Sequence, residues 1–322
     1  RDRGDPAFTW RGASDSGSGV AGYYVYWGTD PGGTSGAWHT ATEYDPPTVP
    51  SPSVYYLRVQ TEDHAGNTSA WLTLFTFRYD ATAPSNPTSF SSSPPVDTWS
   101  TDNTVYVSWS GASDGTGSGV YGYSYEYSTS ASTLPDAVVD TTGTSTTSPA
   151  LADDDNWYFH IRTRDNVGNW ASDAAHHGPF KIDTLAPTSP TSATETHGVA
   201  DDTWQNTVDD PSFTWSGATD AGSGVAGYYV YWGTEPSGTS GAWQVGTIFD
   251  PPAVSDPSVD YLRVRTEDNA GNTSPWLALF TFRYDGSPPA GPTSVIETHG
   301  VSDDTWQNTV GDPAFTWSGA SD

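Results

Sequence analysis

The sequence contains no cysteine and no methionine, and it carries a single lysine, Lys181. Without cysteine there is no disulfide framework, so rigidity has to come from packing or from bound metal. Because there is no methionine, Arg1 is not a translation start, and we expect the chain to be a window of a longer polypeptide.

Basic residues are scarce throughout the chain. Eleven Lys and Arg residues stand against 39 Asp and Glu residues, which gives a formal net charge of −28 at pH 7. Phosphate backbones and anionic lipid surfaces repel a polyanion of this kind. The composition therefore predicts no nucleic-acid partner and no membrane insertion in this segment, and it favours association with divalent cations.

No stretch shows the periodicity of an amphipathic helix. Short runs rich in Tyr, Val, Thr, Phe and Trp instead alternate with polar residues between clusters of Gly, Pro, Ser, Asp and Asn, as in antiparallel strands joined by turns. Phe213 and Trp215 alternate with polar residues in one run, and Leu262 and Val264 do so in another. Each run therefore has one face for a core and one face for water.

One stretch occurs four times in the chain. It begins at Trp10, again at Trp109 and Trp215, and a last time at Trp317, close to the final residue. The spacing of about 100 residues is the size of one compact domain, so the sequence predicts a tandem array of one module. The predicted parts are module 1 at 1–80, which lacks its first strand, module 2 at 81–184, module 3 at 185–286, and the opening strands of module 4 at 287–322.

The strand pattern within one module predicts a sandwich of two antiparallel sheets. Seven short strands in about 100 residues are typical of Greek-key sandwiches of the immunoglobulin and fibronectin type III kind. The predicted fold class is all-β, a tandem array of seven-stranded Greek-key β-sandwiches. In module 3 the strands are expected near 191–196, 212–216, 226–232, 242–245, 247–249 or somewhat later, 260–266 and 277–284.

A second repeated block resembles a known kind of repeat. The run from Tyr261 to Ser274, together with Trp215 and a linker of the form Asp-x-x-Ala-Pro, is similar to the fibronectin type III-like and Ig-like repeats of large bacterial surface proteins and adhesins. The resemblance covers every complete module. It implies a β-sandwich fold and an extracellular location at the cell surface, but it indicates function only weakly, because such modules serve as stalks, spacers and binding units.

Repeated aspartates lie at positions that this fold would bring together. The loop between the second and third strands and the loop between the last two strands lie at the end where a module begins, beside the incoming linker. Each of these three segments carries one repeated aspartate. The predicted metal clusters are Asp80, Asp114 and Asp165 at one boundary and Asp183, Asp220 and Asp268 at the next, with Asp15, Asp63, Asp154, Asp285 and Asp322 as further candidates.

Calcium is the cofactor that these clusters would suit. Ca²⁺ takes about six to eight oxygen ligands and tolerates irregular geometry, so carboxylates from separate loops can share one ion. At a typical extracellular affinity of about 10⁻⁴ M, millimolar calcium would add about 1.4 kcal/mol per site, which would stiffen a boundary without building a fold. An alternative stays open, because Asp-Asn-x-Gly-Asn and Ser-Asp-x-Gly-Ser-Gly can be turns whose side chains bond their own backbone.

The third strand of modules 1 and 3 is aromatic on both faces. Alternate side chains of a strand point to opposite faces, so only one aromatic face can belong to the core. The other face would form a contact surface that stacks on sugars or packs against a neighbouring subunit. The residues assigned to it are Tyr24 and Tyr26 in module 1 and Tyr229 and Tyr231 in module 3; module 2 lacks this order of residues.

Other residue groups give weaker signals. His176 and His177 have no cysteine or histidine at ligand spacing around them, so a solvated loop is predicted there rather than a metal site. The sequence also has no nucleophile elbow, phosphate loop or paired acid and base, which argues against an enzyme. Trp99, Trp204 and Trp306, in the connection between the first two strands, are expected either to pack at the next boundary or to cover a sheet edge.

Taken together, these features predict a non-enzymatic extracellular structural protein. In this hypothesis a calcium-stiffened rod of repeats forms a bacterial surface filament, stalk or adhesin shaft, and its partners are neighbouring repeats or further copies of itself. The alternative is an array of carbohydrate-binding modules, accessory to a secreted glycan-degrading enzyme, whose partners are glycans. An exposed aromatic pair in every module would favour the alternative, and its loss in module 2 mildly favours the structural hypothesis.

Overall fold

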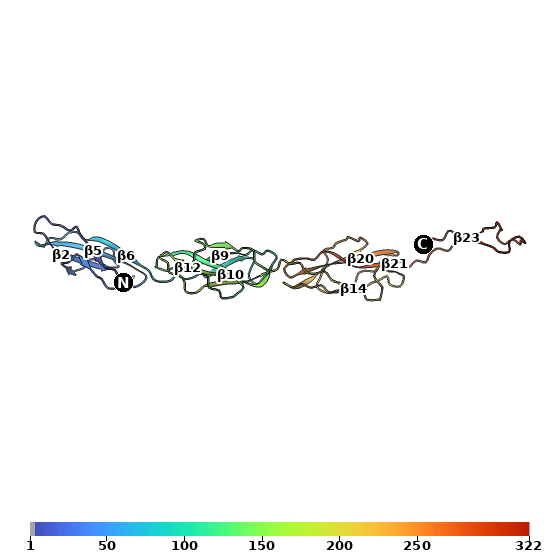
Figure 1. Ribbon diagram of the computed structural model, residues 1–322, viewed down its shortest axis with the longest axis horizontal. Helices are drawn as coiled ribbons and strands as arrows, with labels where there is room; N and C mark the ends of the chain where they lie inside the picture. The colour runs from blue at the N-terminus through green and yellow to red at the C-terminus, as the bar shows by residue number, and fades with distance from the viewer. Residues whose placement is uncertain (1–3, 322) are drawn as a thin grey trace. The chain divides into compact units, whose positions relative to one another are not determined.

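The computed structural model describes residues 4–321, and every regular element in that range is a β-strand. The chain divides into two compact units, Arg1–Asp183 and Thr184–Asp322. Figure 1 shows strands of both units. The all-β class predicted from the sequence is confirmed, and residues 4–321 contain no helix that could cross a membrane.

The first unit begins with the strands of module 1. A four-stranded sheet has the order β3-β2-β5-β6, and a separate pair joins β1 and β4. Tyr23, Val25, Leu57 and Val59 form the buried core, so alternation along the two longest strands turns one face inward as predicted. The strands are β1 (Phe8–Thr9), β2 (Val20–Gly28), β3 (Trp38–His39), β4 (Glu43–Tyr44), β5 (Ser53–Asp63) and β6 (Leu72–Tyr79).

Seven further strands of the first unit form a sandwich of two sheets. One sheet has the order β11-β9-β7, and the other has the order β10-β12-β13-β8. Because paired strands are not always consecutive in the chain, this is the Greek-key arrangement of an Ig or fibronectin type III-like sandwich. The strands are β7 (Ser89–Ser93), β8 (Trp99–Ser100), β9 (Tyr106–Ser110), β10 (Val120–Ser128), β11 (Ser145–Thr147), β12 (Asp154–Asp165) and β13 (Ala175–Ile182).

The second unit repeats this arrangement. One sheet has the order β14-β16-β19, the other has the order β15-β21-β20-β17-β18, and β22 pairs with β23. The strands are β14 (Ser192–Glu195), β15 (Trp204–Gln205), β16 (Phe213–Ser216), β17 (Val225–Gly233), β18 (Trp243–Gln244), β19 (Ile248–Phe249), β20 (Ser258–Asp268), β21 (Leu277–Tyr284), β22 (Ser294–Glu297) and β23 (Phe315–Ser318). All seven strands expected in module 3 are present within one or two residues of their predicted ends.

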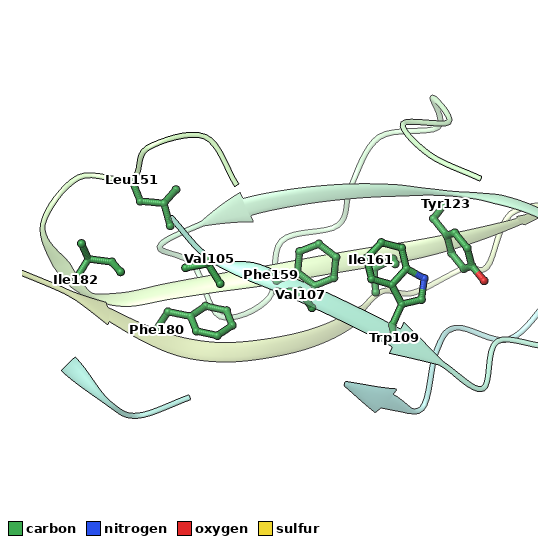
Figure 2. Packing of buried hydrophobic residues seen from close by; sticks show 9 residues of the cluster. All are labelled: Val105, Val107, Trp109, Tyr123, Leu151, Phe159, Ile161, Phe180 and Ile182. Atoms are coloured by element: carbon green, nitrogen blue, oxygen red, sulfur yellow. The ribbon is translucent and has the colours of Figure 1, made fainter. Parts of the chain in front are cut away.

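Aromatic and branched side chains from both sheets fill the core of the sandwich that strands β7 to β13 form. Figure 2 shows Trp109 and Val107 of β9 beside Phe159 and Ile161 of β12. The Trp109 and Phe159 rings stack with their centroids 5.5 Å apart, and Phe159 is fully buried. Because the chain has no disulfides, the core depends on packing, and these large aromatic side chains supply much of the buried area.

The short strands β8 and β15 were not predicted from the sequence. Each pairs in parallel with the last strand of its own sandwich, β8 with β13 and β15 with β21. In the second unit Asp202 Oδ1 accepts a hydrogen bond from Arg283 Nε at 2.7 Å, and the Arg283 guanidinium carbon lies 5.5 Å from the centre of a Trp204 ring. Trp204 thus covers the edge of its own sheet, which is one of the two positions expected for it. Trp306, in contrast, is fully exposed.

Candidate functional site

The structure brings the first predicted acidic cluster together. Asp80 follows β6, Asp114 lies in the loop between β9 and β10, and Asp165 ends β12. Each offers a carboxylate oxygen, and these oxygens all lie within 4.8 Å of one another. The cluster combines a linker residue with residues from two separate loops, which is the geometry the sequence predicted.

Neighbouring N–H groups hold these carboxylates in place. Asp80 Oδ2 accepts the Ser118 N–H at 2.6 Å, and Asp114 Oδ2 accepts the Gly119 N–H at 2.7 Å. Burial alone would raise the pKa of Asp80, but hydrogen bonds from the Thr82 and Ser118 N–H groups outweigh it and hold that pKa below its ordinary value. Asp114 Oδ1 is different, because it is buried and accepts no hydrogen bond from the protein.

The turn chemistry weighed as the alternative is also present. Asp165 is fully buried, and its Oδ1 accepts the N–H groups of Gly168 at 2.6 Å and of Asn169 at 2.7 Å. In module 1 the Asn67 side chain and N–H donate to Asp63, which lowers the pKa of that carboxyl. The repeated Asp-x-x-Gly-Asn block therefore builds a turn, and calcium binding stays a prediction.

Residues of the second predicted cluster occupy the equivalent elements. Asp183 is the last residue of the first unit, is fully buried, and donates its N–H to the Ser100 carbonyl at 3.0 Å. In the second unit, Asp220 Oδ2 accepts the Gly224 N–H at 2.7 Å, and Asp268 accepts the Asn272 N–H at 2.8 Å.

The further candidate acids have local partners or lie elsewhere. Asp15 Oδ2 accepts the N–H groups of Gly17 and Gly19, each at 2.9 Å. Asp154 is exposed and accepts the N–H of Asn156, and Asp285 accepts the N–H of Ser287. Asp322 lies outside the described residues.

The four tyrosines of the predicted contact surface differ in what they contact. Tyr26 is half-buried beneath the loop that follows its own strand, where its hydroxyl accepts the Asp30 N–H at 3.1 Å. Tyr231 makes the same bond with Glu235. Tyr24 is packed against Trp38, with ring centroids 5.0 Å apart.

Tyr229 lines a groove of about 530 Å³ on the surface of the second unit. Its ring centre lies 5.8 Å from the Arg265 guanidinium carbon, and Arg265 donates a hydrogen bond to Thr273. A hydrogen bond to the Glu267 carboxylate raises the pKa of Tyr229. The remaining lining residues are Thr239, Ser240, Gly271 and Trp276.

The structure corrects the prediction of a solvated loop at the histidine pair. His176 and His177 lie on the strand β13 and not in a loop. His176 is exposed, as predicted, whereas His177 is half-buried with its ring stacked on Phe90 at 5.1 Å. His160, which is fully buried on β12, faces His176 with the two Nδ1 atoms 2.7 Å apart. Burial, followed by the neighbouring His176, lowers the pKa of His160 to about 4. The two histidines meet because the register between β12 and β13 pairs His160 with His176, and no signal in the sequence gives that register.

Comparisons with known proteins find two exoglucanases that are similar in sequence to this chain. No family model matches the chain. The chain is 30% identical over 279 residues to exoglucanase B of Cellulomonas fimi, a match that covers 84% of this chain and 23% of the relative. It is 31% identical over 299 residues to exoglucanase A of the same organism, covering 88% of this chain and 31% of the relative. The chain therefore spans less than a third of the length of these relatives.

A search of solved structures finds the FN1–FN3 domains of chicken CNTN1. The identity is 14%, the TM-score is 0.33, and the match covers 87% of this chain and 93% of that chain.

Proposed function

We propose that this chain is a non-catalytic array of fibronectin type III-like modules in a secreted polysaccharide-degrading enzyme. The observation that carries the proposal is the similarity to two exoglucanases, which extends over 84% and 88% of this chain but over only 23% and 31% of the relatives. A match of that extent fits a segment that accompanies a catalytic domain. The second unit adds a surface groove with aromatic and charged side chains, a suitable lining for sugars.

Of the two hypotheses drawn from the sequence, this proposal favours the array accessory to a secreted glycan-degrading enzyme over the surface filament, stalk or adhesin shaft. The filament hypothesis depends on self-association, and it stays a prediction. The extracellular location is shared by both hypotheses and agrees with a polysaccharide substrate, which is too large to enter a cell. The role proposed for the modules is to hold, space or orient a catalytic domain at its substrate.

The test is the composition of the intact polypeptide. The protein would be purified from the culture supernatant of its source organism, isolated as a single band by denaturing electrophoresis, and only then digested with trypsin and mapped by mass spectrometry. We expect peptides of this chain and of a glycoside hydrolase domain in one covalent polypeptide. A full-length protein built only of repeats and a cell-wall anchor would contradict the proposal and favour the stalk hypothesis.

We also propose that the cluster of Asp80, Asp114 and Asp165 binds Ca²⁺. Two of its features support this proposal. The three carboxylates approach within 4.8 Å, where like charges repel unless a cation lies between them. The buried Asp114 Oδ1 has no hydrogen-bond donor, and a buried charged oxygen without a partner is costly.

Calcium titration of the whole chain tests the metal proposal. Isothermal calorimetry should show binding with a dissociation constant of about 10⁻⁴ M, and millimolar Ca²⁺ should raise the unfolding temperature of module 2 relative to EGTA. Asp114→Asn should remove the response of this site, whereas Asp154→Asn, an exposed acid outside the cluster, should not. An unchanged unfolding transition with and without EGTA would show that the block is a turn only.

A further inference from the structure

A stripe of three side chains crosses the outer face of one sheet in the second unit. Trp243 on β18 is in register with Tyr229 on β17, and Tyr229 is in register with Arg265 on β20. Tyr228 and Val230, which flank Tyr229 in the strand, are buried in the core. Because alternate side chains point to opposite faces, the stripe lies on the face away from the core.

Trp243 forms a fixed and open platform at one end of this stripe. Its indole packs on the backbone of Gly227, where a β-carbon would lie only 2.7 Å from the ring. The residue nevertheless remains 46% exposed. A large aromatic side chain that is held in place but left open to solvent is typical of a contact surface.

Hydrogen-bond donors and acceptors both lie beside the aromatic rings. The groove of about 530 Å³ continues the stripe past Tyr229 to Arg265, Glu267 and Trp276. Small-ligand sites commonly have volumes of about 300–1,000 Å³. Arg265 can donate hydrogen bonds and Glu267 can accept them, and their opposite charges balance each other.

We propose that this stripe and groove bind a neutral polysaccharide chain, an inference that rests on the proposed function. A sugar ring presents a flat C–H face that packs on aromatic rings, and hydroxyl groups at its rim that pair with charged side chains. Trp243 and Tyr229 supply the rings, and Arg265 and Glu267 supply the partners. The net charge of −28 repels acidic polysaccharides, which makes the ligand a neutral one.

Module 1 carries a copy of the arrangement. Trp38 is in register with Tyr24, and Tyr24 donates a hydrogen bond to Glu62. Trp71 stands at the position of Trp276, and Gln60, in register with Tyr24, replaces Arg265 with another hydrogen-bonding side chain.

Module 2 lacks the arrangement. Ser124 takes the place of the tyrosine and is buried at 1% exposure, where it donates a hydrogen bond to Asp136. Val139 Cγ1 approaches Gly122, the glycine that corresponds to Gly227, in place of the indole ring. We therefore expect modules 1 and 3 to bind polysaccharide, because each carries the arrangement, and module 2 not to bind it.

Affinity electrophoresis of the full chain tests this assignment. Native gels would contain barley β-glucan, xylan, mannan or polygalacturonate. We expect retardation by at least one neutral polysaccharide, a loss of apparent affinity of at least tenfold in Y24A/Y229A, and no retardation by polygalacturonate. The matched control is Tyr121→Ala, which removes a tyrosine of module 2 that is 46% exposed and lies over Arg164; it should bind like the wild type within twofold.

A second variant guards against misfolding. E62Q/E267Q keeps the size of both side chains but removes their charge, and it should weaken binding at least threefold while leaving the circular dichroism spectrum unchanged. The assignment is overturned if Y24A/Y229A binds like the wild type, if polygalacturonate retards the chain as strongly as the neutral polysaccharides, or if the wild-type chain is retarded by none of them. In each of these cases the composition of the intact polypeptide still decides the proposed function on its own.

Discussion

At the scale of single residues, one aspartate organises the last turn of each module. Asp63, Asp165 and Asp268 end equivalent strands, and each accepts N–H groups from the residues that follow. An ionised carboxylate has about four lone-pair sites, and the oxygens that accept these turn bonds are the same oxygens that a cation would bind. Asp165 alone accepts four hydrogen bonds, from the N–H groups of Val167, Gly168 and Asn169 and from the Asn169 side chain. This is why the repeated Asp-x-x-Gly-Asn block could not by itself separate a turn from a calcium ligand.

A buried histidine, His160, makes module 2 sensitive to acid. The pKa of His160 is lowered from 6.5 to about 4 by burial and by His176, so the folded state holds this ring neutral while the unfolded state protonates it near pH 6.5. The unfolded state therefore binds more protons between these two values, and stability is lost as the pH falls from about 6.5 to about 4. Glu126 is in register with His160 on the other side but is exposed.

Imidazole ¹H–¹⁵N spectra recorded between pH 3.5 and 8 measure this effect directly, because the chain has only seven histidines. The His160 resonance should titrate near pH 4, and His160→Asn should reduce the loss of stability on acidification. His39, on the short strand β3 of module 1, supplies the matched control through His39→Asn, which should leave the acid response of module 2 unchanged. Titration of His160 near its ordinary pKa would contradict the burial argument.

Single-residue roles could be predicted only where sequence spacing fixes them. The aspartate cluster of module 2 follows from the order of strands and loops, and the structure brings Asp80, Asp114 and Asp165 together. The pairing of His160 with His176 depends on the register between two strands, which spacing does not give. The loop that covers Tyr26 is also invisible to a pattern of alternating residues, because its path depends on Gly33 lying against the ring.

At the scale of elements, long alternating runs were predictable and short edge strands were not. β20 alternates buried and half-buried residues along its entire length, and β21 has the bounds that the sequence predicted. β8 and β15 contain two residues each, too few for any periodicity. Each follows an aspartate that pairs with a basic residue of the last strand, Asp97 with Lys181 at 2.6 Å and Asp202 with Arg283 at 2.7 Å. Both aspartates adopt a positive φ, which no pattern of hydrophobicity reveals.

The contact between β17 and β18 requires a glycine. A β-carbon at Gly227 would lie 2.6 Å from the Gln244 carbonyl and 2.7 Å from the Trp243 ring, so Gly227→Ala should push β18 outward. Overpacking of this kind costs about 1–3 kcal/mol. Hydrogen exchange measured by mass spectrometry should show faster exchange across 242–246, and polysaccharide binding by module 3 should fall with it.

Gly246→Ala is the matched control for this element, because a β-carbon there meets nothing within 4 Å. It should change neither exchange nor binding. Unaltered exchange across 242–246 in Gly227→Ala would mean that Trp243 is free to move aside, and the idea of a fixed platform would fail.

At the scale of the whole molecule, charge and similarity limit the function in complementary ways. A net charge of −28 on 322 residues disfavours nucleic acids, anionic membranes and acidic polysaccharides. The match to less than a third of each exoglucanase supports the proposal that this chain accompanies a catalytic domain. The sequence alone left the filament and the accessory array both open, because a β-sandwich serves either function.

The most direct test of the proposed accessory function compares the full-length protein with a form in which these residues are replaced by a flexible linker. Hydrolysis would be measured on an insoluble neutral polysaccharide and on a short soluble oligosaccharide. We expect a severalfold slower rate on the insoluble substrate and an unchanged rate on the soluble one, because only the insoluble substrate depends on holding and orientation at a surface. If the replacement left the rates on both substrates unchanged, or if this chain hydrolysed a polysaccharide on its own, the proposed function would be contradicted.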